Sequence, residues 1–330
     1  MLYGVLLFRR TFPVQERVRA GVSYKAMLQE AGILSCIIVV PLMVAKLGRV
    51  FEWSVPVQVA IGVVLLIGYG AYTRALGRFM LFFLMLIMIP LATTELGTDS
   101  WITDLMKVEM GKMDLHPGWV PVYTSLIMMI LRFYAGPIVK RLSPLGLLAV
   151  SSVIAAVGLY SLSAATGAVI LVAATIYGFG KTFFWPAMLG VVSERFPKGG
   201  ALTLNTIAAV GVLGVGVLGG PFLGKVQDGY IEETLKEQNE QLHARVIASE
   251  PNRSVFGEYQ ALDPAKEALV TDVGEKAEIA AVREEAKKAA LLRVTIFPII
   301  MLICYVALIF YFRAKGGYKA EVLTEDSGGA

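Results

Sequence analysis

Charged residues are scarce in this chain of 330 residues: 17% are Asp, Glu, Lys or Arg, whereas 56% are hydrophobic. Soluble domains average about 25% charged residues, so the mean hydropathy of +0.66 favours a lipid environment. The only two cysteines, Cys36 and Cys304, lie in apolar runs, which excludes a disulfide scaffold. The only two histidines, His116 and His243, share no ligand spacing, so we expect no metal site.

The sequence contains few signs of nucleic-acid binding, enzymatic activity or nucleotide binding. The net charge of +4 is small, and no basic stripe with interleaved aromatic residues is present, so we expect no nucleic-acid partner. No G-x-S-x-G elbow or paired Cys/His nucleophile occurs, and we expect neither an enzyme nor a bound cofactor. Gly180-Lys181-Thr182 resembles the end of a phosphate-binding loop, but Thr175 stands where that loop requires its first glycine.

Long apolar runs, by contrast, are abundant. A bilayer core of about 30 Å requires about 20 apolar residues per helix. Eight runs reach or approach this length, which predicts an all-α, polytopic helical membrane protein with eight transmembrane helices over about 32–47, 54–73, 79–99, 119–139, 145–165, 168–192, 201–224 and 292–313.

The basic residues orient these helices. Met1–Phe8 is apolar but too short to span, and we interpret it as the end of a helix whose beginning is missing. If 1–31 is cytoplasmic, both termini lie inside, and 225–291 lies outside. The inner side then carries most of the basic residues of the termini and short loops, whereas the opposite short loops hold four: Arg9, Arg10, Arg17, Arg19, Lys25, Arg74, Arg78, Lys140, Arg141, Arg195, Lys198, Arg313, Lys315 and Lys319 lie inside.

The outer loop and the tail are the polar parts of the chain. Residues 230–248 and 264–290 are rich in strong helix formers, which predicts a solvated helical hairpin rather than a binding module. The polar tail of 314–330 is expected to be disordered.

The glycines of 214–219 fit the pattern G-x-G-x-x-G, but they lie in mid-membrane with no strand before them. We interpret Gly216 and Gly220, which have G-x-x-x-G spacing, as helix-packing residues.

Four charged residues stand out inside predicted spans, where a charge is costly unless it faces protein or water. Lys181 lies between two glycines and Pro186, so we expect a broken helix lining a cavity, with Trp185 on the same face. Arg132 lies at a similar depth, either as a tether to helix-end carbonyls or in contact with a solute. Two cations at one depth repel unless water or an anion separates them.

The other two are carboxylates, Glu95 and Asp99, at i,i+4, with Trp101 just beyond. Glu95 lies deeper by about 6 Å, so it is the better candidate to bind a proton, and Asp99 is expected to be solvated. On these depths we expect no direct pair between Glu95 and Lys181. A structural counter-ion role for Lys181 remains the alternative.

The six spans from residue 79 onward resemble the C-terminal half of a major facilitator superfamily (MFS) transporter. Gly136-Pro-Ile-Val-Lys140-Arg141 is similar to that family's gating loop between helices eight and nine, although Lys140 stands where an acidic residue is usual. The run 178–189, followed by 192–197, is similar to its tenth helix and inner loop. By this resemblance 79–313 is the six-helix half, 32–77 is the additional helix pair of fourteen-helix members, and 1–31 is the end of a truncated helix plus the central loop.

The resemblance implies alternating access around a midplane site between two six-helix halves. The hypothesis is therefore a proton-coupled symporter of a small polar solute in the lipid bilayer, an integral protein of a bacterial inner (plasma) membrane, present as a C-terminal fragment. It would require the missing N-terminal half or a partner subunit. The alternative is a non-transporting membrane module: a remnant, an assembly subunit or a sensor.

Overall fold

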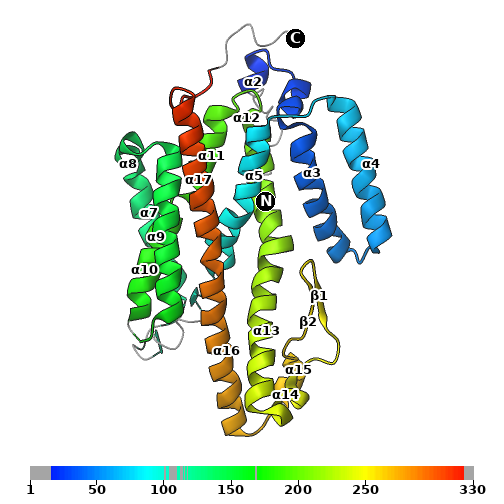
Figure 1. Ribbon diagram of the computed structural model, residues 1–330, viewed down its shortest axis with the longest axis vertical. Helices are drawn as coiled ribbons and strands as arrows, with labels where there is room; N and C mark the ends of the chain where they lie inside the picture. Colours follow the sequence, from blue (N-terminus) through cyan, green and yellow to red (C-terminus); the bar gives the residue numbers. More distant parts are fainter. Residues whose placement is uncertain are drawn as a thin grey trace, which may run out of the picture.

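The computed structural model describes residues 16–99, 102–103, 110–111, 114, 116, 118–167 and 169–322, and it is mostly helical (Figure 1). Within this part, seven helices are long and apolar enough to cross a membrane. An all-helical membrane fold is therefore plausible, with one candidate span fewer than expected. The seven are Tyr24–Val50, Val55–Thr73, Phe79–Gly97, Pro144–Ala164, Val169–Arg195, Gly200–Gln238 and Val273–Ala314.

A kinked helix opens the described chain. After the short α2 (Glu16–Arg19), helix α3 (Tyr24–Val50) begins before the expected start at residue 32, capped by the Ser23 hydroxyl. Gly32 has a φ of 59°, which the absence of a Cβ permits, and it interrupts the helix there. The freed N–H of Ile33 donates to the carbonyl of Ala75 at 3.0 Å, beyond the end of α4 (Val55–Thr73).

The predicted span over 119–139 is the one that is absent from the seven candidate spans of the described chain. It is split into α7 (Trp119–Phe133) and α8 (Ala135–Arg141). Pro137 has no N–H to donate to the carbonyl of Phe133, and its ring clashes with that carbonyl, so the helix breaks here. The 15 residues of α7 measure about 22 Å, short of a bilayer core of about 30 Å.

Three interrupted helices help to complete the bundle. One of them is broken between α10 and α11, and the other two contain π-helical turns. Helix α5 continues into a π-helical turn, η1, and α12 continues into a second, η2. The elements are α5 (Phe79–Ala92), η1 (Thr93–Gly97), α9 (Pro144–Ala164), α10 (Val169–Lys181), α11 (Phe184–Arg195), α12 (Gly200–Gly214), η2 (Val215–Gly219) and α17 (Ile296–Ala314).

The predicted glycine packing occurs, but at other glycines. A Cβ added at Gly219 would overlap the hydroxyl of Thr93, so this glycine lets η1 and η2 touch. The position of Gly216 faces only the side chain of Lys46, and that of Gly220 meets only a carbonyl of its own helix. The rotation of the helix about its own axis decides which glycines face the neighbouring helix, and G-x-x-x-G spacing alone does not fix that rotation.

The polar segment 225–291, predicted to lie outside, is continuous with the helices that flank it. Helix α13 (Gly220–Gln238) prolongs α12, and α16 (Val273–Val294) leads into α17, so two long helices leave the bundle side by side (Figure 1). Between them lie α14 (Glu240–Val246), the antiparallel strands β1 (Asn252–Ser254) and β2 (Gly257–Tyr259), and α15 (Pro264–Ala268).

Residues 225–291 form a subdomain, named the outer subdomain after its predicted side of the membrane, with an apolar core of its own. Ile231, Leu235, Leu242, Val282 and Ala286 are buried together there, apart from the main core of the bundle. The expected helical hairpin is present, but its helices pack around a core, and the β-hairpin was not anticipated.

The start of the tail is ordered, contrary to expectation. Glu321 forms ion pairs with Arg78 at 2.8 Å and with Arg195 at 2.9 Å. The Tyr318 hydroxyl donates to Glu194 at 2.8 Å. Burial raises the pKa of Tyr318 well above its usual value, and the bond to Glu194 raises it further. The tail segment 315–322 therefore joins the adjacent ends of α5, α11 and α17, because cations from separate helices share one carboxylate.

Candidate functional site

Two interruptions in helices create the candidate site. Helix α10 ends at Lys181 and α11 begins at Phe184, and the intervening carbonyl of Thr182 is released from the helix. Across from it, Pro90 lacks an N–H, and the helix widens into η1 one turn later. Such π-helical turns occur frequently at functional sites, and this one carries Glu95.

Lys181 is almost completely buried and forms an ion pair with Asp99. Its side chain is 3% exposed, whereas that of Asp99 is 53% exposed. Asp99 is thus open to its surroundings, but it also compensates a buried ammonium group, a pairing that the depth estimate missed. The ammonium nitrogen also lies 5.6 Å from the ring centroid of Tyr177.

Glu95 is the buried carboxylate of the site, with its side chain 7% exposed. One oxygen lies 3.7 Å from a guanidinium nitrogen of Arg132. The other accepts a hydrogen bond at 3.2 Å from the backbone N–H of Trp185, at the start of α11. Helix N-termini leave backbone N–H groups free and favour negative charge, so the break in the helix itself stabilises Glu95.

Arg132 contacts both the break between α10 and α11 and the π-helical turn η1. Its Nε donates to the carbonyl of Thr182 at 3.2 Å, in the break between α10 and α11. The expected tether to a helix-end carbonyl is therefore present, together with the contact to Glu95. Its side chain is 43% exposed, which leaves part of the guanidinium open to a ligand.

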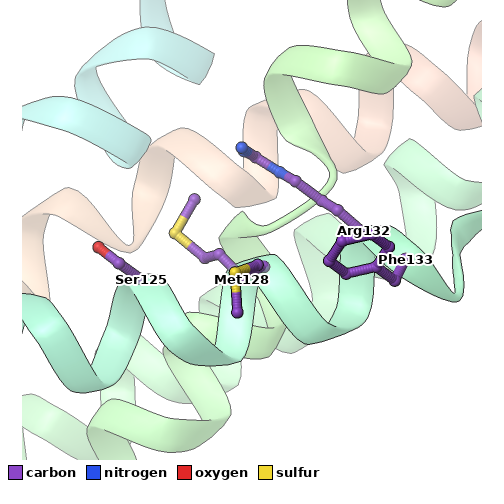
Figure 2. Close-up of a pocket in the computed structure, with 5 residues that line it drawn as sticks. Ser125, Met128, Arg132 and Phe133 are labelled. Atoms are coloured by element: carbon purple, nitrogen blue, oxygen red, sulfur yellow. The ribbon is translucent and has the colours of Figure 1, made fainter.

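A cavity of about 440 Å³ opens beside Arg132 (Figure 2). Figure 2 shows Arg132 reaching away from α7, with Ser125 and Met128 further along the same helix. A smaller hollow of about 80 Å³ shares Ser125 and Met128 with it and reaches Asp99 and Lys181. Arg132 thus borders the larger cavity and the pair of Lys181 and Asp99 borders the adjacent smaller hollow, and both are lined by apolar residues with a few charged and hydroxyl groups, as in small-molecule sites.

Tyr177 is a member of the site that the sequence did not single out. It is completely buried, its hydroxyl lies 2.7 Å from the Thr98 hydroxyl, and it donates to the carbonyl of Thr94 in η1. Its position one turn before Lys181 was the available signal. By binding a carbonyl that the π-helical turn leaves accessible, it connects α10 to η1.

The remaining expected residues lie elsewhere. Trp185 contributes its backbone N–H, because the break in the helix separates it from the face of Lys181, and its ring lies near Gly211. Gly136 and Arg141 lie in α8, on the far side of the break at Tyr134. Trp101 and the side chain of Lys140 lie outside the described part.

Among the described residues, no group of three or more His, Cys, Asp or Glu could hold a metal ion. Comparisons of the chain with models of known protein families, with curated proteins and with solved structures find no match.

Proposed function

We propose that this chain forms the C-terminal part of a proton-coupled secondary transporter for a small polar solute. The observation that carries the proposal is the set of two opposite-charge pairs, Glu95 with Arg132 and Lys181 with Asp99, beside a cavity at a broken helix. Charges inside a membrane are costly and mark ion and substrate pathways. Discontinuous helices are the usual source of substrate and ion sites in transporters.

The arrangement supports a specific coupling step. Ionised Glu95 holds the guanidinium of Arg132. When Glu95 takes up a proton this attraction is lost, and the exposed side of Arg132 becomes available to a polar group of the solute. Solute release and deprotonation then restore the pair. Coupling therefore arises because proton and solute both depend on one ion pair.

Lys181 and Asp99 have a supporting role in this scheme. They keep the adjacent smaller hollow polar without adding net charge, because one ammonium offsets one carboxylate. The second six-helix half that alternating access requires would come from an N-terminal half or from a partner subunit. The membrane would be a bacterial inner membrane.

The outer subdomain gives some support to the alternative, a non-transporting membrane module. It has an independent core and extends well beyond the bundle (Figure 1). Such a part suits an assembly subunit or a sensor better than a minimal transporter.

Proton flux separates the two functions. Proteoliposomes containing the chain within its complete assembly, with the N-terminal half or partner subunit present, and an internal pH dye are given a panel of small sugars, amino acids, organic acids and nucleosides. We expect at least one solute to cause internal acidification that an uncoupler abolishes. A non-transporting module gives no solute-dependent signal with any of them.

A further inference from the structure

A second cavity lies outside the proposed transport site, where the outer subdomain meets the bundle. It has a volume of about 680 Å³, within the range that holds drug-sized ligands. Helices α13 and α16 and the tip of the β-hairpin surround it. The residues that line it and bear on its chemistry are Phe222, Lys225, Glu233, Phe256, Leu292 and Arg293.

The cavity sits at the boundary between the apolar and polar parts of both long helices. Lys225 is the first charged residue after the uncharged stretch 199–224, and Arg293 is the last one before the uncharged stretch 294–312. The two helices pack against each other here, so both cations lie at one level. In a membrane that level is the headgroup region.

Below the cations the wall of the cavity is apolar and aromatic. The ring of Phe222 packs against Phe256 at 5.7 Å and against Phe297 at 5.3 Å between centroids. Val255 and Phe256, at the tip of the hairpin, are 53% and 42% exposed. Exposed apolar residues at a hairpin tip are costly in water but stable at the membrane interface.

The hairpin also lies near the Val50 end of α3. Burial raises the pKa of Tyr259 in β2, and the nearby charge of Arg49 opposes that rise. Figure 1 shows the hairpin pointing along α13 towards that end of α3. Its apolar tip therefore points towards the level where that helix ends.

Lys225 and Arg293 both have hydrogen-bond donors that remain available to a ligand. Lys225 donates one hydrogen bond, to the carbonyl of Phe256 at 2.5 Å, and an ammonium group has three to give. The guanidinium of Arg293 is exposed and forms no ion pair within the described residues. Glu233 lies two turns beyond Lys225, about 12 Å along α13, so it does not neutralise the inner end of the cavity.

We propose that this cavity binds an anionic phospholipid from the adjacent leaflet. The headgroup phosphate lies between Lys225 and Arg293, and the acyl chains lie along Phe222 and Leu292. Guanidinium and ammonium groups are the usual phosphate ligands, and a phospholipid matches both the charged rim and the apolar wall. The proposal rests on membrane insertion but not on transport.

The test is titration of the detergent-solubilised protein with fluorescent phosphatidylglycerol, with phosphatidylcholine and inorganic phosphate as competitors. We expect phosphatidylglycerol to bind at least tenfold more tightly than phosphatidylcholine. The double variant Lys225→Gln/Arg293→Gln should lose at least tenfold in affinity. Lys236→Gln/Lys276→Gln removes the same charge from exposed positions on the same helices and should bind as the unmodified protein does.

Equal affinity of the two double variants would overturn the proposal. Displacement of the lipid by millimolar inorganic phosphate would also overturn it, because the site would then recognise free phosphate. Should Lys225→Gln/Arg293→Gln fail to fold, Phe256→Ser keeps both cations and should still weaken lipid binding. Unchanged binding by that variant would contradict the proposed apolar wall. Extraction of the protein from membranes by alkaline carbonate would refute insertion separately, whatever the transport assay shows.

Discussion

The pair formed by Lys181 and Asp99 should respond very differently to loss of either partner. Asp99→Ala leaves a 3% exposed ammonium without its carboxylate, and breaking a buried pair in this way costs about 3–5 kcal/mol. Lys181→Met leaves a carboxylate that is 53% exposed and can be hydrated. The flexible thioether also fills the space of the lysine stem, so we expect a loss of about 1 kcal/mol.

The double variant Asp99→Ala/Lys181→Met removes the stranded charge. It should recover most of the stability lost in Asp99→Ala, which gives a coupling free energy of about 2–4 kcal/mol. At about 2 °C per kcal/mol, Asp99→Ala should lower the Tm by about 6–10 °C. Thermal unfolding of the purified protein in one detergent measures all four forms. Additive losses in the double variant, or a larger loss for Lys181→Met than for Asp99→Ala, would refute this reasoning.

Three further predictions concern packing, the tail and topology. Gly219→Ala should destabilise the protein by about 1–3 kcal/mol, measured by thermal unfolding, because the new methyl group overlaps Thr93, whose hydroxyl is held by a backbone carbonyl. Glu321→Ala should lower the free energy of unfolding by about 1 kcal/mol, because two partly exposed ion pairs are lost, and should speed proteolysis of the tail. Single cysteines at Lys140 and Ser249, in a variant without native cysteines, should react with an impermeant thiol reagent from opposite sides of the membrane.

Matched controls sharpen these tests. Gly178→Ala adds the same methyl group in a bundle helix where nothing lies within 4 Å, and it should be close to neutral. Glu237→Ala removes an exposed carboxylate of α13 and should leave tail proteolysis unchanged. If either control matches its test variant, the corresponding contact contributes nothing measurable. Labelling of both cysteines from one side would contradict the orientation.

Hydropathy located most of the bundle from the sequence, because a span must satisfy its own backbone and remain apolar for about 20 residues. The run 54–73 coincides with α4, apart from one residue at its start. The break at Lys181 was also foreseeable, since glycine and proline weaken a helix wherever they occur. The position of α4 and the break at Lys181 therefore both follow from composition and local helix propensity.

Other features depend on contacts that no local pattern specifies. The partner of Lys181 is decided by which carboxylate of Glu95 and Asp99 faces α10, and the π-helical turn at η1 alters that register. The order in 315–322 comes from arginines at the ends of α5 and α11 that both pair with Glu321. The close approach at Gly219, rather than at Gly216, likewise follows from the rotation of one helix against another.

Glu95 provides the most direct test of the proposed coupling site. In a complete transporting assembly, we predict that Glu95→Gln keeps solute exchange across proteoliposome membranes but loses uphill uptake driven by a pH gradient. The amide keeps the shape of the carboxyl group but cannot carry a proton on and off. Glu237→Gln, on the exposed face of α13, should leave both activities intact. Full gradient-driven uptake by Glu95→Gln would contradict the central claim that the pair of Glu95 and Arg132 couples protons to solute.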